Sequence, residues 1–311
     1  MNRKLALAGK VGISLVLIYI LLRKTPIADL VQAWGKFSLF TIASVIVLYF
    51  IALLINVFKW KIFLPGQPFA RLFRFTFIDV FYNMVLPGQL SGEVAKAFRL
   101  GKRTGEMKNV ISSVWLDKLT GIIGLLIVML IGFSFSSRYF PWYLFVIMVL
   151  LIILGIGSIY ALDLPFVSDW FLRILGSIKS KWSSKIADSV RSLLVHFKGV
   201  EKPPALIAVN IVLGACYQIA AILMIVVLAA QLSIHLSLLE WFWIFGVVSI
   251  IQFIPISVAG LGVREASFVG ILAVFAVPAS TALVLSLSIF GIQLFYAFIG
   301  AIVEADYNIR G

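Results

Sequence analysis

Long, unbroken apolar runs recur along this chain, and they limit its fold more than any other feature. A run of about twenty apolar residues is long enough to cross a hydrocarbon core of about 30 Å as an α-helix. Such runs are found at 5–22, 39–58, 109–133, 142–161, 204–229 and 279–303. Strands of a membrane β-barrel would instead alternate apolar and polar residues over about ten positions. The sequence therefore predicts an all-α polytopic membrane protein with about six full transmembrane helices.

Composition supports a membrane location. Of the 311 residues, 62% are hydrophobic and 13% are charged, whereas an average soluble domain has about 25% charged residues. The run at 5–22 is expected to be a retained span, because no small-residue cleavage site follows it. The net charge of +13 is interpreted as a signal of membrane orientation, so no nucleic-acid partner is expected.

Two further apolar regions, at about 70–100 and 240–276, are interrupted by proline, glycine and charged residues. If each region enters and leaves the membrane on the same side, nearly all loop lysines and arginines fall on the side of the N-terminus. A full crossing by either region would place the basic segment 163–203 on the opposite side. The charge distribution therefore predicts two re-entrant hairpins within a single membrane domain, 1–311, with both termini cytoplasmic.

Segment 163–203 repeats apolar residues at steps of three and four, with basic residues between them. This pattern is typical of amphipathic helices that lie at the cytoplasmic headgroup layer. A surface that docks a partner protein is the alternative interpretation.

Both interrupted regions contain the pattern Pro-x4-Gly, preceded by a side-chain amide and followed by a carboxylate. Proline ends a helix and glycine permits a tight reversal. The residues expected to break the helices are Pro87, Gly88, Gly92, Pro255, Gly260 and Gly262. Two matched breaks that open to opposite sides are typical of an inverted repeat with discontinuous helices.

Charged residues lie at membrane depth near these breaks. The helix that follows each break has free N–H groups that favour an anion, although Glu93 and Glu265 are also ordinary first-turn residues. Asp117 and Lys118 interrupt an otherwise apolar run, which costs roughly 3 kcal/mol per charge unless the charge is paired or solvated. The expected partners of Asp117 are Lys96, Arg99 or Arg264.

Other embedded polar residues fall into two groups. Asp79 and Asn83 are four residues apart, so they share a helix face and are expected to point into the same cavity. Interhelical hydrogen bonds are expected for Asn56, Gln218 and Gln293. The sequence contains no Walker loop, dinucleotide fingerprint, G-x-S-x-G elbow or His/Cys metal cluster, so no enzyme activity, cofactor or metal is expected.

Four stretches resemble motifs of one known family. In chain order they are Phe58-Lys59-Trp60, Asn83-x3-Pro87-Gly88-x3-Gly92-Glu93-x5-Arg99, Trp115–Gly121 and Gly260-Leu261-Gly262-Val263-Arg264-Glu265. The family is the flippase-like membrane domain of the lysylphosphatidylglycerol synthase/flippase family, which also occurs as stand-alone proteins. Ser91 replaces the usual first glycine, and Asp117-Lys118 replaces Glu-Arg. The resemblance covers nearly the whole chain and implies a stand-alone membrane domain without the aminoacyl-transferase domain.

The resemblance implies a flippase that moves an anionic phospholipid or lipid-linked headgroup between leaflets of the inner (cytoplasmic) membrane of a prokaryote. The expected substrate-binding residues are Asn83, Glu93, Lys96, Arg99, Asp117, Lys118, Gln252, Ser257, Arg264 and Glu265. Expected partners are membrane lipids, with a homo-oligomer or a lipid-synthesis enzyme left open. Two alternatives stand beside this reading: a scaffold that docks an envelope-lipid synthase through 163–203, and a small-solute or ion transporter. Gradient-driven transport and passive scrambling are both left open.

Overall fold

A computed structural model describes residues 27–86, 90–136, 140–161, 201–254 and 260–310, together with three single positions between 161 and 201. The predicted span 5–22 and nearly all of segment 163–203 lie outside the described residues. So do four predicted site or hairpin residues, namely Pro87, Gly88, Pro255 and Ser257.

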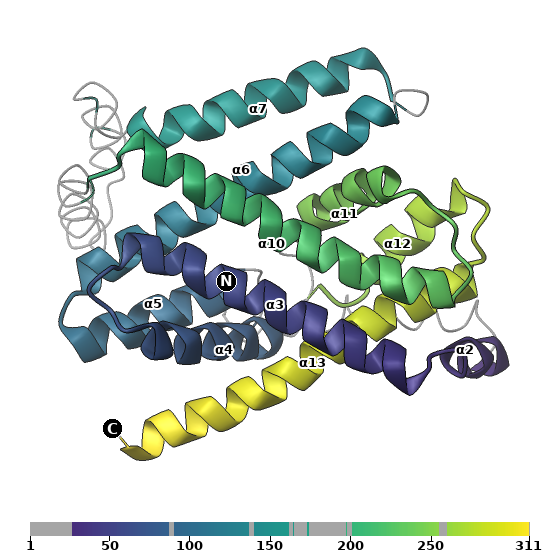
Figure 1. The fold of residues 1–311 in the computed structure, drawn as a ribbon, viewed down its shortest axis with the longest axis horizontal. Coiled ribbons are helices and arrows are strands. Elements are labelled where there is room, and N and C mark those ends of the chain that lie inside the picture. The colour runs from purple at the N-terminus through teal and green to yellow at the C-terminus, as the bar shows by residue number, and fades with distance from the viewer. Residues whose placement is uncertain are drawn as a thin grey trace.

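The described residues are helical, and they contain no β-strand. The helices, labelled as in Figure 1, are α2 (Ile27–Trp34), α3 (Leu39–Phe63), α4 (Phe69–Val85), α5 (Ser91–Thr104), α6 (Met107–Phe135), α7 (Trp142–Ala161), α10 (Pro204–Gln231), α11 (Leu238–Gln252), α12 (Val263–Ala273) and α13 (Ala279–Arg310). The predicted all-α class is thereby confirmed for the described part of the chain.

Within the described residues, five helices are long and apolar enough to cross a membrane: α3, α6, α7, α10 and α13. They coincide with the predicted spans from 39–58 to 279–303. Helix α7 has the highest mean hydropathy of the five, 2.8, and only 11% of its most apolar window is buried. Large side chains such as Leu150 and Leu154 are exposed on it. A helix this apolar and this exposed is suited to contact with lipid.

Local sequence sets where several helices begin. The Ser38 side chain accepts a hydrogen bond from the Thr41 N–H at 3.1 Å, which caps the start of α3. At the start of α11, Ser237 and Glu240 form a reciprocal capping box, with the Ser237 N–H donating to Glu240 Oε2 at 2.8 Å. These bonds satisfy N–H groups that have no partner inside a helix.

The long helices form the body of the bundle. Helix α10 packs against α3 and α6, α11 packs against α6, and α13 packs along α4 (Figure 1). The contact between α6 and α10 is close enough that a Cβ on Gly124 would lie 2.6 Å from the Ala215 nitrogen. Small residues at such contacts let helices approach closely, which is a common basis of packing in membranes.

The two interrupted regions form two pairs of short helices, α4–α5 and α11–α12. Figure 1 shows α4 and α5 toward the end of the bundle where α3 ends and α6 begins, while α11 and α12 lie toward the opposite end. These helices have 17, 14, 15 and 11 residues. A helix needs about twenty residues to span the hydrocarbon core. Gly260 and Gly262, just before α12, have φ values of 74° and 82°, a region that favours glycine.

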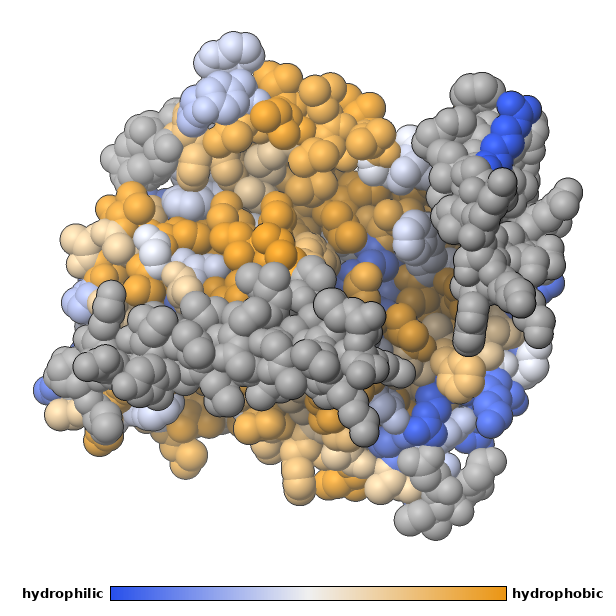
Figure 2. All heavy atoms as spheres, turned by 180° about the vertical axis from the view of Figure 1, so that it is seen from behind, coloured by the Kyte–Doolittle hydropathy of each residue, from blue (hydrophilic) through white to orange (hydrophobic). Residues whose placement is uncertain are grey.

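The surface agrees with this arrangement. Figure 2 shows a mostly hydrophobic face, with strongly hydrophilic residues gathered at the end that lies on the left of Figure 1. Exposed basic residues at the junction of α5 and α6 include Lys102, Arg103 and Lys108. Basic residues are concentrated on the cytoplasmic side of many membrane proteins, and the charge pattern predicts that side here.

Candidate functional site

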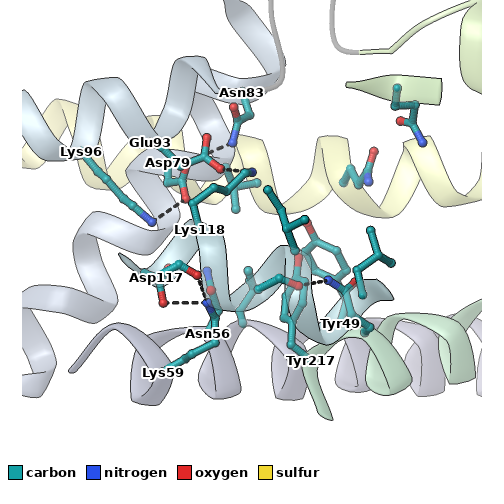
Figure 3. A pocket seen from close by; sticks show the side chains of 18 of the residues that line it. Tyr49, Asn56, Lys59, Asp79, Asn83, Glu93, Lys96, Asp117, Lys118 and Tyr217 are labelled. Carbon is teal, nitrogen blue, oxygen red and sulfur yellow. Dashed lines mark hydrogen bonds and ion pairs between the residues drawn. The ribbon is translucent and has the colours of Figure 1, made fainter. Parts of the chain in front are cut away.

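A cavity of about 260 Å³ lies among the helices, lined by residues of both interrupted regions and of the long helices between them. Its lining residues are Tyr49, Leu53, Asn56, Lys59, Asp79, Val80, Asn83, Met84, Glu93, Lys96, Asp117, Lys118, Gly121, Ile122, Leu125, Tyr217, Gln218, Gln252, Phe253 and Gln293. Six of them are charged, three lysines and three carboxylates, and Figure 3 shows these six converging from α3, α4, α5 and α6.

The six charges form three ion pairs, and each pair joins two helices (Figure 3). The distances from lysine Nζ to carboxylate oxygen are 2.8 Å for Lys59–Asp117, 3.1 Å for Lys96–Asp79 and 2.5 Å for Lys118–Glu93. These pairs connect α3 with α6, α5 with α4, and α6 with α5. Paired charges escape most of the cost of an isolated charge in an apolar surrounding, which accounts for their retention here.

The start of α5 is fixed by side chains of α4. Asn83 Oδ1 accepts a hydrogen bond from the Gly92 N–H at 2.8 Å, while Asn83 Nδ2 donates to Asp79 Oδ1 at 2.9 Å. A Cβ on Gly92 would overlap both the carboxylate and the carbonyl oxygen of Asp79. Glycine is therefore required at residue 92, because the backbone of α5 lies directly against Asp79 and Asn83 of α4. The sequence prediction that Asp79 and Asn83 share one cavity is confirmed.

Lys96 and Lys59 are both buried, with 1% and 3% of their surface exposed. The Lys96 ammonium lies 4.7 Å from the ring centroid of Trp60, so it is held between an aromatic face and the Asp79 carboxylate. Lys59 Nζ also donates to the backbone carbonyl of Asp117. The lysine positions are thus set by surrounding groups before any ligand binds.

Among the described residues, the Glu93 carboxylate has one oxygen that is paired and one that is not. Its Oε1 receives Lys118, but its buried Oε2 has no hydrogen-bond partner in the described part of the chain. Buried carboxylate oxygens normally accept a hydrogen bond. This oxygen is therefore available to a donor on a molecule in the cavity.

Arg264 and Glu265 are buried, and neither lines the cavity. Arg264 Nη2 donates to Glu265 Oε1 at 2.8 Å, and Nη1 donates to Gln293 Oε1 at 2.7 Å. The other Glu265 oxygen accepts from the Gly262 N–H at 2.6 Å and so caps α12. Gln293 lines the cavity, so Arg264 is hydrogen-bonded to a residue of the cavity wall.

Arg99 also lies outside the cavity. It forms an ion pair with Glu304 of α13, and its Nη2 donates to the Tyr82 hydroxyl at 2.9 Å. Arg99 is six residues beyond Glu93, about 9 Å farther along the helix axis and on another face. That face of α5 meets α13, where Glu304 supplies the opposite charge.

The prediction that Asp117 pairs with Lys96, Arg99 or Arg264 was wrong, because its partner is Lys59. Sequence reasoning treated Lys59 as a flanking residue because it follows the predicted span 39–58. Helix α3 continues to Phe63, which carries Lys59 into the bundle. The apolar Trp60 and Phe63 after Lys59 were the signal that the helix goes on.

Among the other predicted residues, Gln252 lines the cavity. Asn56, Gln218 and Gln293 also line it, in addition to any role between helices. Tyr49 and Tyr217 had not been singled out, because tyrosines in apolar helices usually report packing alone. The described residues contain no group of three or more His, Cys, Asp or Glu side chains suited to a metal ion.

Together, the apolar long helices, the paired short helices and the charged cavity between them define a polytopic α-helical membrane protein with a buried polar site. Residues 7–300 match the family described as lysylphosphatidylglycerol synthase TM region, and the chain belongs to that family. Over 180 residues it is 28% identical to the UPF0104 membrane protein PH1989 of Pyrococcus horikoshii, a match that covers 56% of this chain and 50% of that relative. The match thus spans half the length of the relative.

Proposed function

We propose that this protein is a transporter, not an enzyme, that moves a phosphate-bearing membrane lipid between the leaflets of the cytoplasmic membrane. The observation that carries the proposal is the convergence of both interrupted regions on one charged cavity. Asn83 and Glu93 come from the first region, Gln252 and Phe253 come from the second, and all four line the cavity. In many transporters, discontinuous helices from two repeats meet at the substrate site.

The chemistry of the cavity suits a lipid headgroup. Lysine ammonium groups bind phosphate as point charges, and Lys96 and Lys118 approach the cavity from different helices. The free oxygen of Glu93 accepts a hydroxyl or ammonium donor from the rest of the headgroup. The three lysines and three carboxylates balance in charge, and each lysine is already paired with a carboxylate. A bound phosphate must therefore replace a carboxylate as the partner of a lysine. Binding thereby competes with the ion pairs that join α5 to its neighbours.

This competition suggests how access alternates. We propose that α4–α5 and α11–α12 are re-entrant hairpins, the first open to the cytoplasm and the second to the outside. The Lys118–Glu93 pair links α5 to α6, and the Lys118 ammonium lies 5.4 Å from the ring centroid of Phe253 at the end of α11. Lys118 therefore contacts both hairpins. A phosphate that binds Lys118 is expected to weaken its ion pair with Glu93 while its contact with the Phe253 ring remains.

The test is lipid movement in liposomes that contain the purified full-length chain and a fluorescent anionic phospholipid, read by dithionite quenching. The parent protein is expected to expose the inner-leaflet probe. The double variant E93Q/K118Q removes one ion pair without leaving a lone charge, and it is expected to slow movement at least tenfold. Lys102→Gln is the matched control, since Lys102 is exposed on α5 and does not line the cavity.

Three results would contradict the proposal. If the parent protein moves no fluorescent phospholipid of any headgroup class, the chain is not a lipid transporter, and the scaffold hypothesis is favoured. If the double variant keeps the parent rate, the cavity is not the route. If entrapped glycerophosphate escapes while lipid stays in place, the substrate is a small solute.

A further inference from the structure

A second pocket, separate from the charged cavity, opens between α4, α5 and α13 with a volume of about 330 Å³. It contains three arginines, Arg71 and Arg74 from α4 and Arg103 from α5, and one carboxylate, Asp306 of α13. Formal charge in this arginine pocket is therefore positive. The inner cavity, by contrast, has equal numbers of lysines and carboxylates.

The pairing of these arginines differs from that of the inner cavity. Arg71 Nη1 donates to the neutral side chain of Gln67 at 2.8 Å, and the Arg103 guanidinium lies over the Tyr307 ring at 5.1 Å. Within the described residues, none of the three arginines forms an ion pair with a carboxylate, whereas every lysine of the inner cavity does. Neither contact neutralises a guanidinium charge, so the pocket is prepared for an external anion.

The geometry of each arginine suits phosphate. A guanidinium group presents parallel N–H donors that match two oxygens of one phosphate. Arg71 and Arg74 are three residues apart and so lie on one face of α4. Gln67 and Tyr307 hold Arg71 and Arg103 in place, which lowers the entropy lost when an anion binds.

The surroundings indicate that the anion belongs to a lipid. Phe75 and Ile78, both buried, form part of the pocket wall. On α13, Phe298 and Ile302 precede Asp306 at intervals of four residues, and 67% and 56% of their surfaces are exposed. This apolar stripe leads along the helix to the pocket. An acyl chain can lie along the stripe while its headgroup sits among the arginines.

We propose that the arginine pocket binds the phosphodiester of an anionic phospholipid from the leaflet on its own side of the membrane. Basic pockets between membrane helices on the cytoplasmic side are a recurring form of lipid-headgroup site. A zwitterionic lipid is disfavoured, because its ammonium group would face unneutralised guanidinium groups. The site does not depend on transport, and it is distinct from the cavity to which the proposed function refers.

The experiment is native mass spectrometry of the full-length chain in detergent, titrated with short-chain phosphatidylglycerol and, separately, phosphatidylcholine. Phosphatidylglycerol is expected to bind more tightly. Arg74→Gln and Arg103→Gln are each expected to weaken its binding about tenfold, the size typical of one lost charge-assisted hydrogen bond. Lys102→Gln, next to Arg103 but outside the pocket, is expected to bind as the parent does.

Both arginines are exposed, so neither substitution is expected to affect folding, and Arg74→Lys is expected to restore part of the affinity. Equal binding of the two lipids, or unchanged binding by the Arg74→Gln/Arg103→Gln double variant, would overturn the proposal. Inorganic phosphate distinguishes a lipid from a free anion. If phosphate displaces phosphatidylglycerol at a similar concentration, the pocket is a free-phosphate site and the lipid assignment is wrong.

Discussion

The buried charges of the cavity are organised in pairs that join neighbouring helices. Lys59 and Asp117 illustrate the pattern, since both are buried and the carboxyl group lies 2.8 Å from the ammonium. Further hydrogen bonds hold the surrounding backbone, including one from Asn210 Nδ2 to the Lys59 carbonyl at 2.6 Å. In such a site, the loss of one partner has a larger effect than the loss of both, because the remaining charge stays buried and unpaired.

This pairing predicts the stability of variants at the Lys59–Asp117 pair. Lys59→Met is expected to lower the free energy of unfolding by about 3–5 kcal/mol, because it leaves Asp117 without its partner. The double variant Lys59→Met/Asp117→Asn is expected to recover most of that loss. Thermal unfolding of the purified protein in detergent checks both. Equal losses in the single and double variants would contradict the expected recovery.

Site residues could be predicted from the sequence where a charged or amide side chain interrupts an apolar run. Asn83, Glu93, Asp117 and Lys118 were predicted near a shared site, because a charged or amide group at membrane depth needs a polar surrounding, and all four line the cavity. The ion-pair partners could not be predicted, since the partner of Asp117 depends on which helices become neighbours. Arg99 fails for the same reason, because its direction depends on how α5 rotates against α13.

At the scale of elements, the contact between α4 and α5 depends on one glycine. The N-terminal turn of α5 rests directly on Asp79 and Asn83, and Gly92 is the residue that permits it. The hydrogen bond from Gly92 to Asn83 also satisfies one of the free N–H groups at the start of the helix. Breaks in apolar helices are thus held by specific side chains, and not by loop length alone.

Gly92→Ala is expected to push α5 away from α4, because the added methyl overlaps the Asp79 oxygens. We expect a loss of at least about 2 kcal/mol in unfolding free energy, typical of overpacking at a buried contact. Gly157→Ala on α7 is the matched control, since a Cβ there meets nothing within 4 Å. It is expected to be neutral or slightly stabilising in a helix. Similar melting temperatures for the two variants would contradict the proposed contact.

Element positions were largely predictable from the sequence. The spans from 39–58 onward follow from uninterrupted apolar length, and the breaks near residues 87 and 255 follow from proline and glycine. Helix ends were less predictable, as the extension of α3 to Phe63 shows. Lysine is compatible with a helix end and with a helix interior, so local sequence could not decide between them.

At the scale of the whole molecule, the two helix pairs lie toward opposite ends of the bundle (Figure 1), and both interrupted regions contribute residues to the cavity. Each pair is followed by a long helix that starts at the same end, α6 after α5 and α13 after α12. The arrangement makes the two halves similar in plan and opposite in direction. Many transporters are built from inverted repeats of this kind, so the plan supports the proposed alternating access.

This plan predicts the orientation of the chain in the membrane. A reporter enzyme fused at Ser180, within the basic segment 163–203, is expected to read cytoplasmic, because in the proposed arrangement both hairpins return to the side from which they enter. A fusion at Arg138, between α6 and α7, is expected to read external. An external signal at Ser180 would mean that one interrupted region crosses the membrane completely, and the two-hairpin arrangement would be wrong.

The most direct measurement is an experimental structure of the full-length protein in nanodiscs that contain an anionic phospholipid, determined with a bound antibody fragment. The proposed function predicts a lipid phosphate in the cavity, in contact with Lys96 or Lys118, between the α4–α5 and α11–α12 pairs. A cavity that stays without lipid, with headgroups only around the outside of the bundle, would contradict it.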